Sequence, residues 1–213
     1  MEPREVAELT IERVVNYCEH NSGDTPLECL ADHSPDQLSI FIDGYLTKEE
    51  AEELDKAIES SETFWDEVKK EYEALWRSWI ATKVGLYLGN EIDLTLYSIT
   101  DNPRLNNTCK ARRLKAYAEV LDQFGDAVLQ ALQKKKPLSR KDLYYWLTEL
   151  GDVAFGGGNY DYDNDVDYYL SYYDELNDEE KLDMLDVLLN EIDDAISTTN
   201  EELRRLGVLT NKS

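Results

Sequence analysis

The sequence predicts an all-α protein: a multi-helix bundle with a small N-terminal helical module and a long C-terminal helix. Apolar residues recur three and four positions apart along most of the chain, the spacing of helices that bury one face. Several of these stripes begin at a Ser or Thr followed three residues later by an acidic or amide side chain, the signature of a capped helix start. Residues 92–96 alternate like a strand but have no evident partner strand, so we expect an extended link or an irregular helix there.

The N-terminal module begins with a helix predicted over residues 4–19. A second helix is predicted to start at Ser34, with Pro35 at its first position and Gln37 completing a capping box. We expect it to end near Gly44. Its apolar positions share one face: Leu38, Phe41, Ile42 and Tyr45.

Thr47 and Glu50 repeat the capping signature and predict a third helix. A fourth is predicted from Ser61 to about Trp79. The apolar residues of the fourth fall on one side: Phe64, Val68, Tyr72, Leu75 and Trp79. Together these elements give a predicted N-terminal module over residues 1–80.

The predicted C-terminal bundle covers residues 81–213. A long helix is expected over residues 107–133, ended by Pro137. Ser139 and Asp142 form the next capping signature. We expect Gly151 to end the helix that they start.

The last helix is predicted over residues 178–206, with a possible break near residues 198–200. Its leucines and isoleucines follow a heptad spacing, which fits packing against the protein's own helices or a homodimer interface. The residues of this seam are Leu182, Leu185, Leu189, Ile192 and Ile196.

Acidic residues dominate the composition. The chain has 213 residues with 46 Asp and Glu against 22 Lys and Arg, a net charge of −24. Phosphate backbones and anionic membranes repel such a chain, so we expect no direct nucleic-acid or membrane binding. A protein with a basic surface is the favoured partner, although an acidic surface also serves solubility. The acidic N-terminus is not a signal peptide, and we expect a cytoplasmic protein.

The Cys and His residues are concentrated in one short region. Cys18, His20, Cys29 and His33 are four of only five such residues in the chain. Thiolates and imidazoles bind zinc, so these four are candidate ligands. Cys18 also fits the apolar stripe of its helix, which favours ordinary buried residues instead. Without a signal peptide, free thiols or a metal are expected rather than a disulfide framework.

Residues 156–168 combine glycines, tyrosines and alternating aspartates. The aspartates resemble a calcium loop, but Tyr168 and Asp174 stand where that loop needs Gly and Glu. A flexible acidic loop is the simpler interpretation. A row of carboxylates imitating nucleic-acid phosphates is the alternative.

Residues 37–50 read as the end of one helix, an Asp-Gly turn, and the capped start of a second helix with an acidic pair. This stretch resembles the N-terminal domain of anti-sigma factors. The resemblance covers about residues 36–68, with the helical hairpin at 34–79. Ala57, Ser61 and Phe64 stand where zinc-binding members carry His and Cys, so a zinc-less variant is implied. The implied partner is an extracytoplasmic-function sigma factor.

No nucleotide-binding loop, serine elbow or His-rich metal motif is present in the sequence, so we do not expect an enzyme. The leading hypothesis is an acidic regulatory protein that binds and inhibits or adapts a protein partner. The alternative is a nucleic-acid mimic that inhibits a DNA- or RNA-binding protein, such as a phage counter-defence protein. The predicted partner-binding residues are Leu38, Phe41, Ile42, Leu46, Glu49, Glu50, Glu52 and Glu53.

Overall fold

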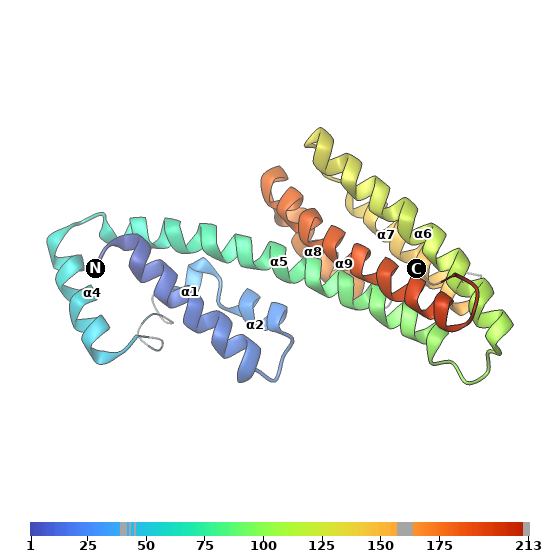
Figure 1. Ribbon diagram of the computed structural model, residues 1–213. Helices are drawn as coiled ribbons and strands as arrows, with labels where there is room; N and C mark the ends of the chain where they lie inside the picture. The colour runs from blue at the N-terminus through green and yellow to red at the C-terminus, as the bar shows by residue number, and fades with distance from the viewer. Residues whose placement is uncertain (39–41, 43, 45, 157–163, 211–213) are drawn as a thin grey trace. The chain divides into compact units, whose positions relative to one another are not determined.

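A computed structural model describes residues 1–38, 42, 44, 46–156 and 164–210 (Figure 1). All regular structure within these residues is helical, so the predicted all-α class is confirmed. The chain divides into two compact units, Met1–Lys83 (unit 1) and Val84–Ser213 (unit 2). This division lies close to the one expected at residue 80.

Unit 1 is built from short helices and the first part of a long one. The elements are α1 (Pro3–His20), α2 (Pro26–Asp32), the 3₁₀ turn η1 (Pro35–Gln37), α4 (Lys48–Ser60) and the first part of α5 (Phe64–Thr100). The expected capping box of Thr47 and Glu50 is present at the start of α4. A second box, formed by Thr25 and Glu28, starts α2.

The core of unit 1 forms around the apolar side of α1. The side chains of Val6, Val14 and Val15 are buried there, and the Thr10 hydroxyl donates a hydrogen bond to the Val6 carbonyl. That bond satisfies the one buried hydroxyl of this face within its own helix. The other elements contribute apolar residues: Leu27 and Leu30 from α2, Leu54 from α4, and Phe64, Val68 and Tyr72 from α5.

The start predicted at Ser34 is wrong in detail. Ser34 makes no side-chain capping hydrogen bond, and the chain forms a 3₁₀ turn over Pro35–Gln37. Pro35 still occupies the first position, as expected. Phe41 and Tyr45 of the predicted face lie outside the described residues.

Unit 2 is a bundle of longer helices. Its elements are the rest of α5, then α6 (Asn107–Lys134), α7 (Arg140–Phe155), α8 (Asn164–Glu175) and α9 (Asp178–Arg205). Ser139 and Asp142 cap α7 as predicted. Asn106, one residue before the expected position, caps α6 by accepting a hydrogen bond from the Cys109 amide.

A buried tyrosine ties α6 to α5 in the centre of unit 2. The Tyr117 hydroxyl donates to the Ile92 carbonyl at 2.7 Å and lies 2.7 Å from the Thr95 hydroxyl. Burial raises the pKa of this phenol well above its ordinary value, so it stays neutral. The segment that alternates like a strand is therefore helix, since both Ile92 and Thr95 belong to α5.

Several glycines lie inside helices, among them Gly151, which we expected to end one. Gly85 and Gly89 of α5 are one turn apart and face α9. A methyl group added at Gly85 would lie 2.9 Å from Val187, and one added at Gly89 would lie 2.5 Å from Glu191. Gly151 is buried within α7, which ends instead at Gly156. Gly156 has φ +90°, a left-handed conformation that favours glycine. The sequence pattern does not separate a glycine that ends a helix from one that admits a neighbouring helix.

Substituting Gly85 and Gly125 with alanine should have opposite effects on stability. A methyl group at Gly85 would lie 3.0 Å from the Met184 carbonyl oxygen, and backbone cannot swing aside. Overpacking of this kind costs about 1–3 kcal/mol, more than the ~1 kcal/mol that alanine gains in a helix. At Gly125 the nearest atom is a side-chain methyl at 3.4 Å, so the helix gain should prevail. Chemical denaturation of the two variants measures this, and a stabilised Gly85→Ala protein would contradict the close approach.

The heptad seam predicted for the last helix is shifted in the structure. Leu185 and Ile192 are buried, but Leu182, Leu189 and Ile196 are only half-buried. The helix runs unbroken through residues 198–200, where the Thr199 hydroxyl donates to the Ala195 carbonyl. The buried stripe consists of Met184, Leu185, Leu188, Ile192, Ala195, Thr199 and Leu203. Much of the predicted seam therefore packs within unit 2, and a homodimer through it remains a prediction.

Three carboxylates lie close together where α5 meets α9. Burial raises the pKa of Asp93, and the charge of Asp194 raises it further. Burial also raises the pKa of Glu191, and repulsion from Asp93 and Asp194 raises it further. The ionised forms of Asp93 and Glu191 are thus less stable in the folded protein than in the unfolded chain.

A double variant, Asp93→Asn with Glu191→Gln, should stabilise unit 2 at neutral pH. The two carboxylates destabilise the fold at a pH where they are ionised in both the folded and the unfolded protein. This penalty decreases as pH falls below their raised pKa values in the folded protein, and it is gone below their ordinary pKa values in the unfolded chain. The gain in melting temperature should therefore be present at pH 7 and vanish below about pH 4. Asp186→Asn with Asp193→Asn is the matched control, because both side chains are exposed on α9. Equal gains in the two double variants would attribute the effect to net charge alone.

Candidate functional site

A groove follows the outer side of α1 in unit 1. One stretch, of about 640 Å³, is lined by Leu9 and Trp79 among others, and an adjoining stretch, of about 470 Å³, continues toward α4. The two stretches share Glu8, Leu9 and Glu12. Leu9 and Trp79 are half-buried and form an apolar floor. We call this feature the α1 groove.

Carboxylates line the α1 groove along most of its length. Glu5, Glu8 and Glu12 are exposed at helical spacings of three and four, so they share one face of α1. Glu12 has no ion pair among the described residues, and Glu8 pairs with Arg4 on its own helix. The complete set of glutamates lining the groove is Glu5, Glu8, Glu12 and Glu19 from α1, with Glu50 and Glu53 from α4.

An ion pair holds the two walls of the groove together. The Arg13 guanidinium on α1 donates to both carboxylate oxygens of Glu50 on α4, at 2.6 and 2.7 Å. This bond, with a further hydrogen bond from the Thr47 amide, lowers the pKa of Glu50 to about 2. Glu50 is thus both the capping residue of α4 and the anchor of α4 on α1.

The predicted partner-binding residues are distributed unevenly. Leu38 and Ile42 are buried, so neither offers an exposed apolar surface to a partner in this structure. Leu46 is half-buried, and Phe41 lies outside the described residues. The acidic part of the prediction is on the surface: Glu49, Glu52 and Glu53 are exposed, and Glu50 is half-buried.

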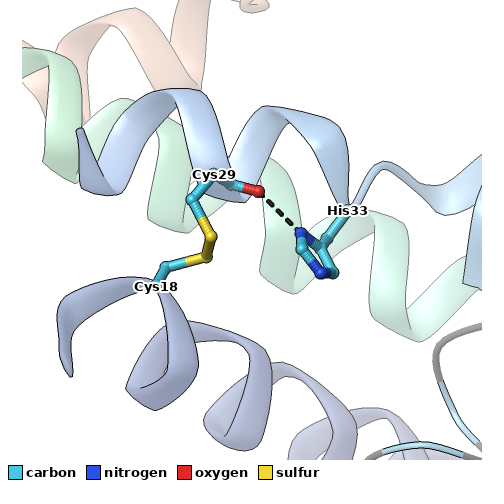
Figure 2. Close-up of side chains that lie close together, drawn as sticks. All are labelled: Cys18, Cys29 and His33. Atoms are coloured by element: carbon cyan, nitrogen blue, oxygen red, sulfur yellow. Dashed lines mark hydrogen bonds between the residues drawn. A yellow bond between two sulfur atoms is a disulfide. The ribbon is translucent and has the colours of Figure 1, made fainter. Parts of the chain in front are cut away.

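A disulfide joins Cys18 of α1 to Cys29 of α2 (Figure 2). Their Cα atoms are 5.5 Å apart, and the two residues are 11 positions apart in sequence. The expectation that the cysteines form no disulfide is therefore wrong for this pair. Cys109 is free and half-buried.

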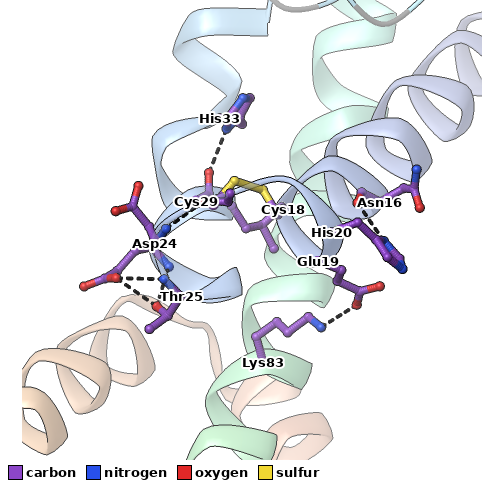
Figure 3. Close-up of a disulfide and its surroundings, with 12 residues drawn as sticks. Asn16, Cys18, Glu19, His20, Asp24, Thr25, Cys29, His33 and Lys83 are labelled. Atoms are coloured by element: carbon purple, nitrogen blue, oxygen red, sulfur yellow. Dashed lines mark hydrogen bonds and ion pairs between the residues drawn. A yellow bond between two sulfur atoms is a disulfide. The ribbon is translucent and has the colours of Figure 1, made fainter.

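His33 lies beside the disulfide, whereas His20 does not. The Nδ1 atom of His33 is 2.7 Å from the Cys29 carbonyl oxygen, and a ring nitrogen and both sulfurs lie within 4.8 Å of one another. His20 is exposed and contacts the Asn16 carbonyl instead (Figure 3). Of the four candidate zinc ligands, the structure therefore brings together Cys18, Cys29 and His33.

Two side chains of α5 hold α2 beside the cluster. The Tyr72 hydroxyl donates to the His33 carbonyl, and the Trp76 indole donates to the Leu30 carbonyl, both at 2.8 Å. Both carbonyls belong to the C-terminal end of α2, where backbone acceptors lack regular helical partners. The Leu30 carbonyl also accepts a hydrogen bond from the His33 amide. In the sequence Tyr72 is only a member of the predicted apolar stripe and Trp76 is not part of it, so neither hydrogen bond had a sequence signal.

The acidic, tyrosine-rich segment is described only in part. Residues 157–163 lie outside the described residues, including the start of the possible calcium loop. From Asn164 the chain is helical, not an extended loop. Arg140 contacts the carboxylates of Asp167 and Asp174, each at 3.2 Å. Two of the carboxylates in and near this segment thus already have a basic partner within unit 2.

Comparison with protein-family models, curated proteins and solved structures finds no match. No helix within the described residues is long and apolar enough to span a membrane. The site must therefore be interpreted from its own chemistry.

Substituting Arg13 with Gln should loosen α1 from α4 and change the acid response of unit 1. The pKa of Glu50 is lower in the folded protein than in the unfolded chain, so its ionised carboxylate stabilises the fold above its ordinary pKa. That contribution is lost as pH falls toward about 2. The melting temperature of the variant should fall at pH 7, and its difference from the parent should shrink as the solution is acidified. Arg4→Gln, which removes an exposed pair with Glu8, is the control. NMR titration of the Glu50 carboxyl provides the direct check: an ordinary pKa in the parent would contradict the assignment.

Proposed function

We propose that this chain is an acidic regulatory protein that binds, and thereby inhibits or adapts, a basic protein partner through the α1 groove. The observation that carries the proposal is an apolar floor, Leu9 and Trp79, with glutamates lining both the α1 and α4 sides. Apolar grooves with charged rims are typical docking sites for amphipathic helices.

The occupant that fits is a helix with apolar residues on one face and Lys or Arg beside them. From Glu5 to Glu19 the groove follows α1 for about 21 Å, at 1.5 Å per residue. A partner helix of about four turns would match that length. Its apolar face would cover Leu9 and Trp79, and its basic flanks would face the glutamates.

The two kinds of contact serve different purposes. Burial of apolar area contributes about 25 cal/mol per Å² before association costs, so the floor supplies affinity. Exposed carboxylates chiefly speed the encounter and select basic partners. Glu12 and Glu53 are well placed for this because both are exposed.

The resemblance to anti-sigma factors makes an extracytoplasmic-function sigma factor the first partner to test. Because Leu38 and Ile42 are buried, we assign its contacts to α1 and to the glutamates of α4 rather than to the predicted apolar face. Glu50 and Glu53 belong to both the sequence prediction and the groove.

A partner captured from the native host should lose affinity when the groove is neutralised. The groove variant carries Glu5→Gln, Glu8→Gln and Glu12→Gln. The control variant carries Glu59→Gln, Glu62→Gln and Glu73→Gln, which are exposed in unit 1 and line no part of the groove. Both remove three negative charges, so the general field of the protein changes equally. We expect the groove variant to slow association about tenfold and the control to change it by less than threefold.

Changing the floor separates this proposal from nucleic-acid mimicry. Trp79→Ala should raise the dissociation rate of the complex while leaving association nearly unchanged, since apolar contacts act after encounter. A mimic would bind mainly through carboxylates, so its affinity would fall steeply with added salt and be insensitive to Trp79. Equal losses in the groove and control variants, with no effect at Trp79, would reject the groove as the binding site.

A further inference from the structure

We propose that Cys18, Cys29 and His33 form a redox-gated metal site that holds Zn²⁺ when the disulfide is reduced. The oxidised form is the disulfide between α1 and α2. In the reduced form the same sulfurs are thiolates, and with the imidazole they make a sulfur- and nitrogen-rich ligand set of the kind zinc prefers. The disulfide bond and the metal ion would use the same two sulfur atoms, so the oxidised form and the metal-bound form exclude one another.

The distances suit a single ion. One ring nitrogen of His33 and the two sulfurs lie within 4.8 Å of one another. Around a tetrahedral zinc ion, with Zn–S bonds near 2.3 Å and Zn–N bonds near 2.0 Å, ligand atoms stand about 3.5–3.8 Å apart. Side-chain rotations of Cys18 and Cys29 after bond cleavage are enough to reach that separation.

His33 has the hydrogen bond typical of a metal ligand. A carbonyl oxygen only accepts hydrogen bonds, so the contact with Cys29 assigns the ring proton to Nδ1 and the lone pair of the neutral ring to Nε2 (Figure 2). Metal-binding histidines commonly donate their second ring nitrogen to a backbone carbonyl in this way. The ring is also 8% exposed, and both cysteines are 4% exposed, so the site is shielded from bulk water.

The rest of unit 1 keeps the ligands together when the bond is open. The Tyr72 hydroxyl donates to the carbonyl of His33 itself, and Trp76 fixes Leu30 in the preceding turn. Neither contact depends on the sulfurs. Lys83 holds Glu19, the residue after Cys18, at 2.7 Å (Figure 3). Both halves of the ligand set are therefore anchored to α5 independently of the disulfide.

Switching requires a thiol reductant and then the metal. Two molecules of a low-molecular-weight thiol exchange with the Cys18–Cys29 bond and leave as their own disulfide, with two protein thiols formed. Binding of Zn²⁺ then releases both thiol protons. Oxidation by a low-molecular-weight disulfide reverses the sequence and expels the ion.

Cobalt titration of the full chain tests the site. Reduced, desalted protein kept under anaerobic conditions should bind one equivalent of Co²⁺ with the visible bands of tetrahedral cobalt thiolate, and Zn²⁺ should displace it. The oxidised protein, which has the same sequence, should show no such bands. This comparison needs no substitution and so does not depend on any variant folding.

The chain supplies matched controls for the ligand assignment. His33→Ala and Cys29→Ser should each weaken Co²⁺ binding at least tenfold. His20→Ala and Cys109→Ser, the other histidine and the other cysteine, should leave the spectrum and affinity unchanged. The proposal is overturned if the reduced parent binds no Co²⁺, if the oxidised parent binds it equally, or if the control substitutions weaken binding as much as the ligand substitutions.

Discussion

An excess of negative charge is the constraint on which much of this structure depends. With 46 acidic and 22 basic side chains, most carboxylates cannot have a basic partner. Several of the basic side chains form ion pairs between two different helices rather than within one helix. Arg13 joins α1 to α4 through Glu50, Lys83 joins α5 to α1 through Glu19, and Arg140 of α7 contacts two aspartates of α8. At these contacts repulsion between the helices is offset by an ion pair. Many other carboxylates are exposed, as along the α1 groove, while Asp93 and Glu191 are partly buried where α5 meets α9 and repel one another.

Unit 1 faces a second problem, because α2 has only seven residues. A helix this short has little stability of its own and needs tertiary contacts. The capping box at Thr25, the Tyr72 and Trp76 hydrogen bonds and the disulfide all act on it. Closing a loop over a sequence separation of 11 contributes about 3 kcal/mol in the chain-entropy model. Opening the bond should therefore lower the stability of unit 1, and the proposed metal ion, held by the same residues, would restore part of it.

Local rules predicted the elements better than the contacts between them. The boxes at Thr47 and Ser139 were readable because a cap and its partner are three residues apart. Gly151 was expected to end its helix but is buried within α7. Gly85 and Gly89 face α9, about a hundred residues further along the chain, and no local pattern shows this contact. The same limit applies to the site: His20 is two positions from Cys18 and His33 is four positions from Cys29, so sequence distance does not single out His33. Only the packing of α2 against α1 and α5 buries one and exposes the other.

The α1 groove and the Cys18–Cys29–His33 cluster share one helix, and this limits how far one can affect the other. Cys18 is followed by Glu19 and lies half a turn from Asn16, and both neighbours line the end of the groove. A change at the sulfurs that shifts the last turn of α1 therefore moves this end. The other end is held independently, since Arg13 is bound to Glu50 and the first turn has its own capping box at Glu2 and Glu5. Under the two proposals, redox state should accordingly adjust the contacts that a partner makes near Glu19 and leave those near Glu5 and Glu8 in place. The cluster would then modulate binding and would not remove the groove.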